Sequence, residues 1–117
     1  MKEYSLFIGR WQPWHSGHQW LVDQRLNKGK NVCIAIRDVE PNDKQPWTAK
    51  EVRDNLKEVF KKQIKAVTVK VIIIQDIESI NYGRGVGYKI IEHIPPDQIK
   101  NISATNIREQ MRKDGTL

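Results

Sequence analysis

Apolar and polar positions follow two kinds of pattern along the 117-residue chain. Three short, nearly continuous apolar runs are typical of buried strands, and they lie at residues 4–9, 31–37 and 67–74. Apolar positions at helical spacing predict four helices, at residues 18–29, 48–63, 86–93 and 105–115. Pro95 and Pro96 would end the third helix, and a short strand is expected near residues 98–103.

Capping residues mark several of the predicted helix ends. Ser16 is the expected cap of the first helix, and Thr48 with Glu51 three residues later has the spacing of a capping box. Gly29 and Gly115 follow the first and last helices, where glycine commonly ends a helix. These signals support the predicted alternation of strands and helices.

Buried strands that alternate with helices predict the α/β class. We expect a Rossmann-like, doubly wound parallel sheet in a three-layer α/β/α arrangement, with helices on both faces. Without a repeat or a linker, residues 1–117 are expected to form a single domain. Ligands of such sheets bind beyond the carboxyl ends of the strands, where the strand order reverses, so the loops after the strands are the place to look for chemistry.

The charge of the chain narrows the choice of ligand. Twenty Lys and Arg residues against 14 Asp and Glu residues leave a net charge of +6, which suits a polyanionic ligand, although an ordinary basic surface is an equal alternative. The chain shows neither a membrane-spanning apolar run nor a signal peptide, so a cytoplasmic location is expected, that of the host if a phage encodes it. Cys33 lies inside an apolar run and is expected to be a buried, inert thiol.

The segment "HSGH" follows the first predicted strand. His15 and His18 flank Gly17 where a helix begins, so free backbone N–H groups, the helix dipole and two imidazoles can all meet a phosphate there. Gly17 lets the backbone approach the ligand closely. A metal site or two structural histidines are the alternatives, but a metal lacks partners, because His93 lies in another segment and no cysteine or carboxylate cluster has ligand spacing.

A second candidate element, "ISATNIRE", lies near the C-terminus. Ser103, Thr105 and Arg108 surround the start of the last predicted helix, where hydroxyls, free N–H groups and a guanidinium can converge on an anion. Taken alone, the pattern is equally typical of ordinary helix capping. It gains meaning only together with the first element.

With both elements in place, the chain resembles the nucleotidylyltransferase (cytidylyltransferase-like) superfamily, which carries HxGH after its first strand and ISxTxxR at a late helix. The opening "GRWQPWHSGH" is most similar to GRFQPFHxGH of the nicotinamide mononucleotide adenylyltransferase type. The segments "RDVEPNDKQPWTAKEV" and "INYGRGVGYKI" are similar to small phage and bacterial adenylyltransferase-like domains. The resemblance spans nearly the whole chain. It implies an enzyme that moves a nucleoside monophosphate from a nucleoside triphosphate to a phosphate-bearing small-molecule acceptor and releases pyrophosphate.

The resemblance also implies roles for particular residues. The catalytic ones would be His15, His18 and Arg108. The residues expected to bind the nucleotide are Ile8, Gly9, Arg10, Trp14, His15, Gly17, His18, Arg84, Ser103, Ala104, Thr105 and Arg108. The residues expected to bind the acceptor, from the loops after the second and third strands, are Asp38, Trp47, Asn81, Tyr82 and Arg84. No protein metal site is expected, because magnesium would arrive bound to the triphosphate.

Several alternatives stay open. Trp47 can instead act as a hydrophobic staple, and Arg84 as a solvated loop charge. ATP is favoured over CTP, because the chain lacks the GTFD opening of the glycerol-3-phosphate cytidylyltransferase-like members. A non-catalytic nucleotide or RNA binding module is the rival class, but the scattered lysines argue against nucleic acid, and neither motif histidine is missing. The acceptor and the oligomeric state, a homo-oligomer included, are not decided by the sequence, and no membrane partner is expected.

Overall fold

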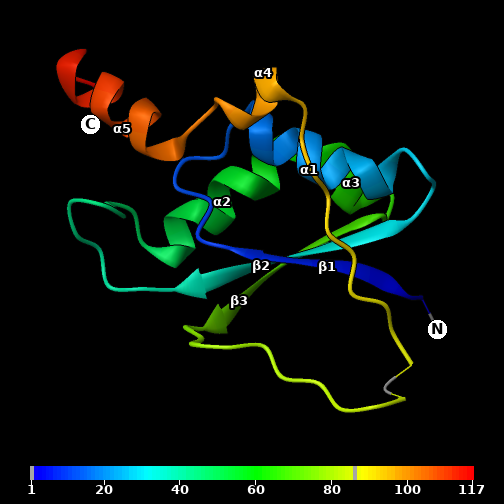
Figure 1. Ribbon diagram of the computed structural model, residues 1–117. Coiled ribbons are helices and arrows are strands. Elements are labelled where there is room, and N and C mark those ends of the chain that lie inside the picture. The colour runs from blue at the N-terminus through cyan, green and yellow to red at the C-terminus, as the bar shows by residue number, and fades with distance from the viewer. Residues whose placement is uncertain (1, 86) are drawn as a thin grey trace.

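The computed structural model describes residues 2–85 and 87–117, and it shows an α/β fold on a three-stranded parallel sheet (Figure 1). The strand order is β1-β2-β3, with β2 paired to both neighbours. The elements are β1 (Tyr4–Gly9), α1 (Ser16–Leu26), β2 (Asn31–Asp38), α2 (Ala49–Val59), α3 (Lys61–Lys65), β3 (Val69–Gln75), α4 (Asp97–Lys100) and α5 (Ala104–Lys113).

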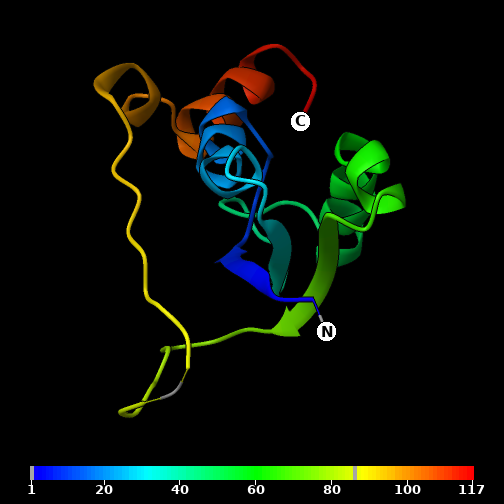
Figure 2. The same cartoon turned by 90° about the vertical axis from the view of Figure 1, so that its right-hand side faces the viewer.

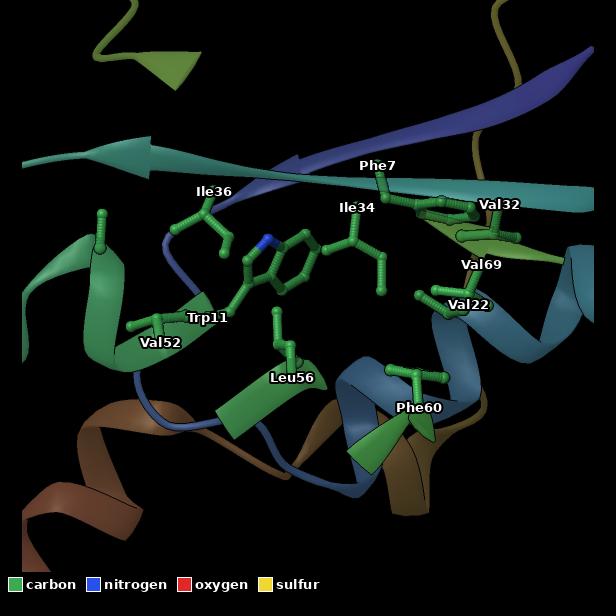
Figure 3. Packing of buried hydrophobic residues seen from close by; sticks show 11 residues of the cluster. Phe7, Trp11, Val22, Val32, Ile34, Ile36, Val52, Leu56, Phe60 and Val69 are labelled. Atoms are coloured by element: carbon green, nitrogen blue, oxygen red, sulfur yellow. The ribbon is translucent and has the colours of Figure 1, made fainter. Parts of the chain in front are cut away.

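The hydrophobic core lies between the sheet and the helices α1 and α2 (Figure 3). Ile34 belongs to β2, the central strand, and is in register with Phe7 of β1 and Val71 of β3. The three side chains therefore share one face of the sheet. Val22 of α1 and Leu56 of α2 pack against this face and are fully buried. Because all three strands are parallel, their carboxyl ends lie at the same edge of the sheet. The common core holds them there.

The α/β class and the parallel sheet are confirmed, whereas the second layer of helices is not seen in the part of the chain that the structure describes. The helices α1, α2 and α3 all lie on one side of the sheet (Figures 1 and 2). Crossovers between parallel strands are right-handed, so two crossovers in the same direction, β1 to β2 and β2 to β3, place their helices on one face. A doubly wound sheet needs an order that reverses, and these three strands do not reverse.

The helix ends agree with the sequence in part. Thr48 and Glu51 form the predicted capping box of α2, and Gly29 and Gly115 take the positive φ angles typical of chain segments after a helix. The cap of α1 is His15 rather than Ser16, which is the first helical residue. The predicted helix over residues 48–63 is interrupted at Phe60, which separates α2 from α3.

Two predicted elements after β3 are wrong. Residues 87–93 form no helix, and residue 86, where that helix was predicted to begin, lies outside the described residues. Ile90, Ile91 and Ile94 are β-branched and exposed, so a helix here would gain no buried face to offset its low propensity. After β3, the segment instead passes on the side of the sheet away from α1 and α2, and then runs past the β1 edge to α4 (Figures 1 and 2). The strand predicted near residues 98–103 is replaced by α4, whose first turn holds Asp97 at the favourable end of the helix dipole.

Cys33 of β2 is buried, as the sequence predicts. Burial raises the pKa of its thiol and so favours the protonated form, against the opposing effect of the Lys70 charge. In the described residues, none of the helices has the length and the apolar character that a membrane crossing requires.

Candidate phosphate-binding site

A cavity of about 440 Å³ lies where the carboxyl ends of β1 and β2 face the start of α5. Its basic side chains come from separate segments: Arg10 follows β1, Arg37 and Lys44 belong to the end of β2 and the next loop, and Arg108 belongs to α5. The described residues that line it include no carboxylate, and they are Gly9, Arg10, Trp11, Gln12, His18, Arg37, Lys44, Gln45, Ala104, Thr105 and Arg108. This lining favours a ligand that carries several negative charges.

The two motif histidines cap the start of α1 reciprocally. His15 Nδ1 accepts hydrogen bonds from the backbone N–H groups of Gly17 and His18, at 3.0 and 3.3 Å. His18 Nδ1 accepts from the backbone N–H of His15 at 3.3 Å, and the two rings stack with their centroids 3.6 Å apart. Because each Nδ1 acts as an acceptor, the proton of each neutral ring lies on Nε2. Each histidine thus keeps one N–H donor for a ligand.

His18 is held neutral by its surroundings. Burial lowers its pKa to about 4, with a further contribution from the charge of His15, and burial also lowers the pKa of His15. The ring of Trp11 meets His18 edge-on at a centroid distance of 4.9 Å, and Trp14 lies 5.2 Å from it. Trp11 is in turn fixed by a 3.1 Å hydrogen bond from its indole N–H to the carbonyl of Ala35. At neutral pH, His18 therefore offers the cavity a positioned, uncharged N–H donor.

The lowered pKa of His18 predicts a pH dependence of folding stability. An unfolded histidine titrates near pH 6.5, so unfolding takes up a proton in the range between about pH 6.5 and 4. The stability that neutral His18 contributes is complete above about pH 6.5 and is lost as the pH falls toward 4. We expect urea unfolding to show a smaller loss of stability over this range in His18→Gln than in the wild type. Equal losses in the two proteins would contradict the assigned pKa shift.

Arg108 closes the cavity from α5. Its Nη1 donates to the backbone carbonyl of Gln12 at 2.5 Å, and its Nη2 donates to Thr105 Oγ1 at 3.3 Å. A guanidinium has five N–H donors, so the remaining three lack partners among the described residues and are available to an anion. Ser103 caps α5 by accepting from the backbone N–H of Asn106, which fixes the helix start beside this group.

The loop after β2 brings Lys44 and Gln45 to the cavity. Asn42 Oδ1 accepts from the backbone N–H groups of Lys44 and Gln45, at 2.8 and 3.1 Å, and so forms a tight turn. Arg112 of α5 donates to the carbonyl of Asp43 and ties the turn to that helix. Gln45 Oε1 is buried and has no partner among the described residues, so it is free to accept a hydrogen bond from a ligand.

Most of the residues predicted to bind the nucleotide lie at this cavity. Those that line it are Gly9, Arg10, His18, Ala104, Thr105 and Arg108. Those that adjoin a lining residue along the chain, or pack against one, are Ile8, Trp14, His15, Gly17 and Ser103. The structure brings the two motifs together, as predicted.

The residues predicted to bind the acceptor divide into two groups. Asp38 adjoins Arg37 of the cavity, and the backbone of Trp47 is bonded to the side chain of Gln12. In contrast, Asn81, Tyr82 and Arg84 belong to the exposed segment that leads away from β3. Tyr82 and Arg84 line a different cavity, which shares no residue with the first. The structure therefore does not bring these three residues to the basic cavity between β1, β2 and α5.

Five residues that line the cavity were not among the site residues predicted from the sequence: Trp11, Gln12, Arg37, Lys44 and Gln45. Arg37 forms a 2.7 Å ion pair with Asp76, so part of its charge is already matched. Arg37 directly precedes Asp38 at the end of a buried strand, and this position was a usable signal. The turn signal "PND" before Lys44 was another, whereas nothing in the sequence indicates the contacts of Gln12.

The fold and the cavity define an α/β protein with a basic cavity at the strand ends, and the chain is similar to two known nucleotide-handling proteins. The chain is 30% identical over 101 residues, 81% of its length, to a nicotinamide-nucleotide adenylyltransferase of Caldivirga maquilingensis, of which it covers 53%. It is 37% identical over 51 residues, 42% of its length, to a nicotinamide/nicotinic acid mononucleotide adenylyltransferase of Acinetobacter baylyi, of which it covers 27%. The chain thus spans at most about half the length of these curated relatives. No protein-family model matches it.

Proposed function

We propose that the chain is a nucleotidyltransferase domain that transfers a nucleoside monophosphate, AMP in preference to CMP, to a phosphate-bearing small molecule. One observation carries the proposal: His18 at the start of α1 and Arg108 of α5, ninety residues apart, line one basic cavity. The distant similarity to nicotinamide mononucleotide adenylyltransferases supports nucleotidyl transfer in general and favours adenylyl transfer.

In the proposed reaction, a phosphate oxygen of the acceptor attacks the α-phosphorus of the triphosphate. The new P–O bond forms as the bond from the α-phosphorus to the bridging oxygen of the β-phosphate breaks, and pyrophosphate leaves with that electron pair. His18 donates its Nε2–H to the α-phosphate oxygens, where charge is redistributed in the transition state, and His15 acts beside it. Arg108 and the start of α5 hold the β- and γ-phosphates. No covalent intermediate with the protein is required.

The cavity also offers groups for the rest of the substrates. Lys44 and Arg37 lie on the side that belongs to the loop after β2, where an acceptor phosphate would add negative charge. The unpartnered Oε1 of Gln45 matches a hydroxyl or amino donor, such as those on the ribose or base of a nucleotide. Among the described residues, no three His, Cys, Asp or Glu side chains group as metal ligands. A basic cavity fits a triphosphate that brings its own magnesium, coordinated by phosphate oxygens and water.

Triphosphate binding should be visible as thermal stabilisation. A ligand present at about 100 times its dissociation constant stabilises the folded state by about 2.7 kcal/mol, so magnesium ATP should raise Tm measurably and should do so more than CTP, GTP or UTP. The unfolding temperature is measured with each triphosphate in turn. Stabilisation by none of the four would reject the proposal at its first step. Stabilisation without pyrophosphate release, against a panel of phosphorylated acceptors that includes nicotinamide mononucleotide, would indicate a binding module instead.

A further inference from the structure

Gln12 stands out because it is a polar residue in the turn after β1 and yet is only 3% exposed. Its side-chain amide makes two hydrogen bonds with the backbone of Trp47, thirty-five residues away. Nε2 donates to the Trp47 carbonyl at 2.9 Å, and Oε1 accepts from the Trp47 N–H at 3.1 Å. The amide thus satisfies both backbone groups of Trp47, much as the backbone of a neighbouring strand would.

The backbone of Gln12 makes the complementary contact with α5. Its carbonyl accepts the 2.5 Å hydrogen bond from Arg108 Nη1. The residue before it, Trp11, is fixed to β2 through its indole N–H and the carbonyl of Ala35. Gln12, in the turn after β1, therefore connects two other parts of the chain. It is bonded to Trp47, which directly precedes the Thr48 cap of α2, and to the guanidinium of Arg108 in α5.

We propose that Gln12 is a positioning residue that sets the placement of Arg108 relative to the loop holding Lys44 and Trp47. This inference rests on the proposed function, in which Arg108 grips the triphosphate and that loop faces the acceptor. The side chain of Gln12 fixes the loop at Trp47, and the backbone carbonyl of Gln12 fixes the guanidinium of Arg108. One residue thus orients the groups proposed to bind both substrates. Gln12 itself transfers no proton and forms no bond to phosphorus.

Removal of the amide leaves the Trp47 N–H and carbonyl without partners in a part-buried position. The loop can then move relative to the turn, and the carbonyl of residue 12 no longer has a fixed direction toward Arg108. Both substrates should bind less well, while the histidines, which are capped independently of Gln12, keep their geometry. The expected signature is a change in KM with little change in kcat.

The kinetic test compares Gln12→Met, which keeps the length of the side chain, with the wild type. KM for ATP and KM for the acceptor should each rise about tenfold while kcat stays within about threefold. Val22→Ala is the matched control, because Val22 is fully buried in the core and its truncation lowers stability without touching the cavity. The control should leave both KM values within about twofold of the wild type.

A double variant makes the test sharper. Since the Gln12 carbonyl holds Arg108, the effects of Gln12→Met and Arg108→Met on KM for ATP should be less than multiplicative. Multiplicative effects, KM values in Gln12→Met equal to those of the wild type, or equal KM increases in Val22→Ala would overturn the inference. An inactive wild type that binds no triphosphate would instead reject the proposed function itself.

A measurement on the unaltered protein covers the case in which Gln12→Met does not fold. The Trp47 backbone amide, which donates to Gln12 Oε1, is followed by NMR while magnesium α,β-methylene-ATP is added. Triphosphate binding at Arg108 should shift this resonance and slow its hydrogen exchange. The reason is that Gln12 is bonded to both groups, so a change in the Arg108 hydrogen bond to its carbonyl also changes the hydrogen bond between its side chain and Trp47. A saturated complex with an unchanged Trp47 amide would contradict the proposed link.

Discussion

Replacement of His18 by alanine is expected to lower turnover by about 10²- to 10³-fold, a loss of roughly 3 to 4 kcal/mol in transition-state stabilisation. The reason is geometric: Nδ1 of His18 is occupied by the N–H of His15, so Nε2–H is the donor left for the α-phosphate. Since burial keeps the pKa of this ring near 4, the donor is neutral and already in place at pH 7. The measurement is kcat for pyrophosphate release under saturating substrates.

The control for this variant is His93→Ala. His93 lies in the segment between β3 and α4, and its ring packs on Phe7 at a centroid distance of 6.3 Å, outside the cavity. Its replacement should leave kcat within about twofold of the wild type. A folded His18→Ala protein with nearly normal turnover would exclude the proposed role of the HxGH segment.

Replacement of Arg108 by methionine is expected to weaken triphosphate binding by about 10- to 100-fold. Methionine keeps much of the apolar stem but removes all five N–H donors, including the three that are available to phosphate. Calorimetric titration with magnesium α,β-methylene-ATP measures the change in Kd directly.

Lys113→Met tests whether the effect is specific to the cavity. Lys113 lies in the last turn of the same helix and is exposed. Its replacement by methionine therefore removes one positive charge without altering a residue that lines the cavity. A comparable loss of affinity in this variant would mean that general electrostatic attraction, and not the grip of Arg108, determines binding.

The sequence predicted those parts of the site that depend on local chain geometry. A glycine and two histidines at a strand-to-helix turn, and Ser103 before a helix, identify helix starts, and helix starts bind anions wherever the fold places them. The parallel sheet places the carboxyl end of β1, and with it the start of α1, at one edge, as the pattern of buried strands predicts. The pairing of "HSGH" with "ISATNIRE" was predicted from the resemblance to nucleotidylyltransferases, since the strand expected before "ISATNIRE" is replaced by α4.

The remaining parts depend on contacts between distant segments, which no local pattern encodes. Gln12 reads as an ordinary turn residue until its amide is seen on Trp47. The segment with Tyr82 and Arg84 was expected to bind the acceptor, but the chain leads it away from the cavity after β3. The α/β, Rossmann-like class was predicted correctly, but the described residues place the crossover helices on one face, because the order of the strands decides which face a crossover helix covers.

The transfer step itself can be followed with ATP labelled at the α-phosphate and with nicotinamide mononucleotide as the first acceptor. The proposed function predicts that the label appears in a dinucleotide product, with one pyrophosphate released for each label transferred and no transfer without acceptor. If nicotinamide mononucleotide fails, the same assay is run across other phosphorylated acceptors. Release of inorganic phosphate from the γ-position, with the label left in ADP, would contradict nucleotidyl transfer by this chain.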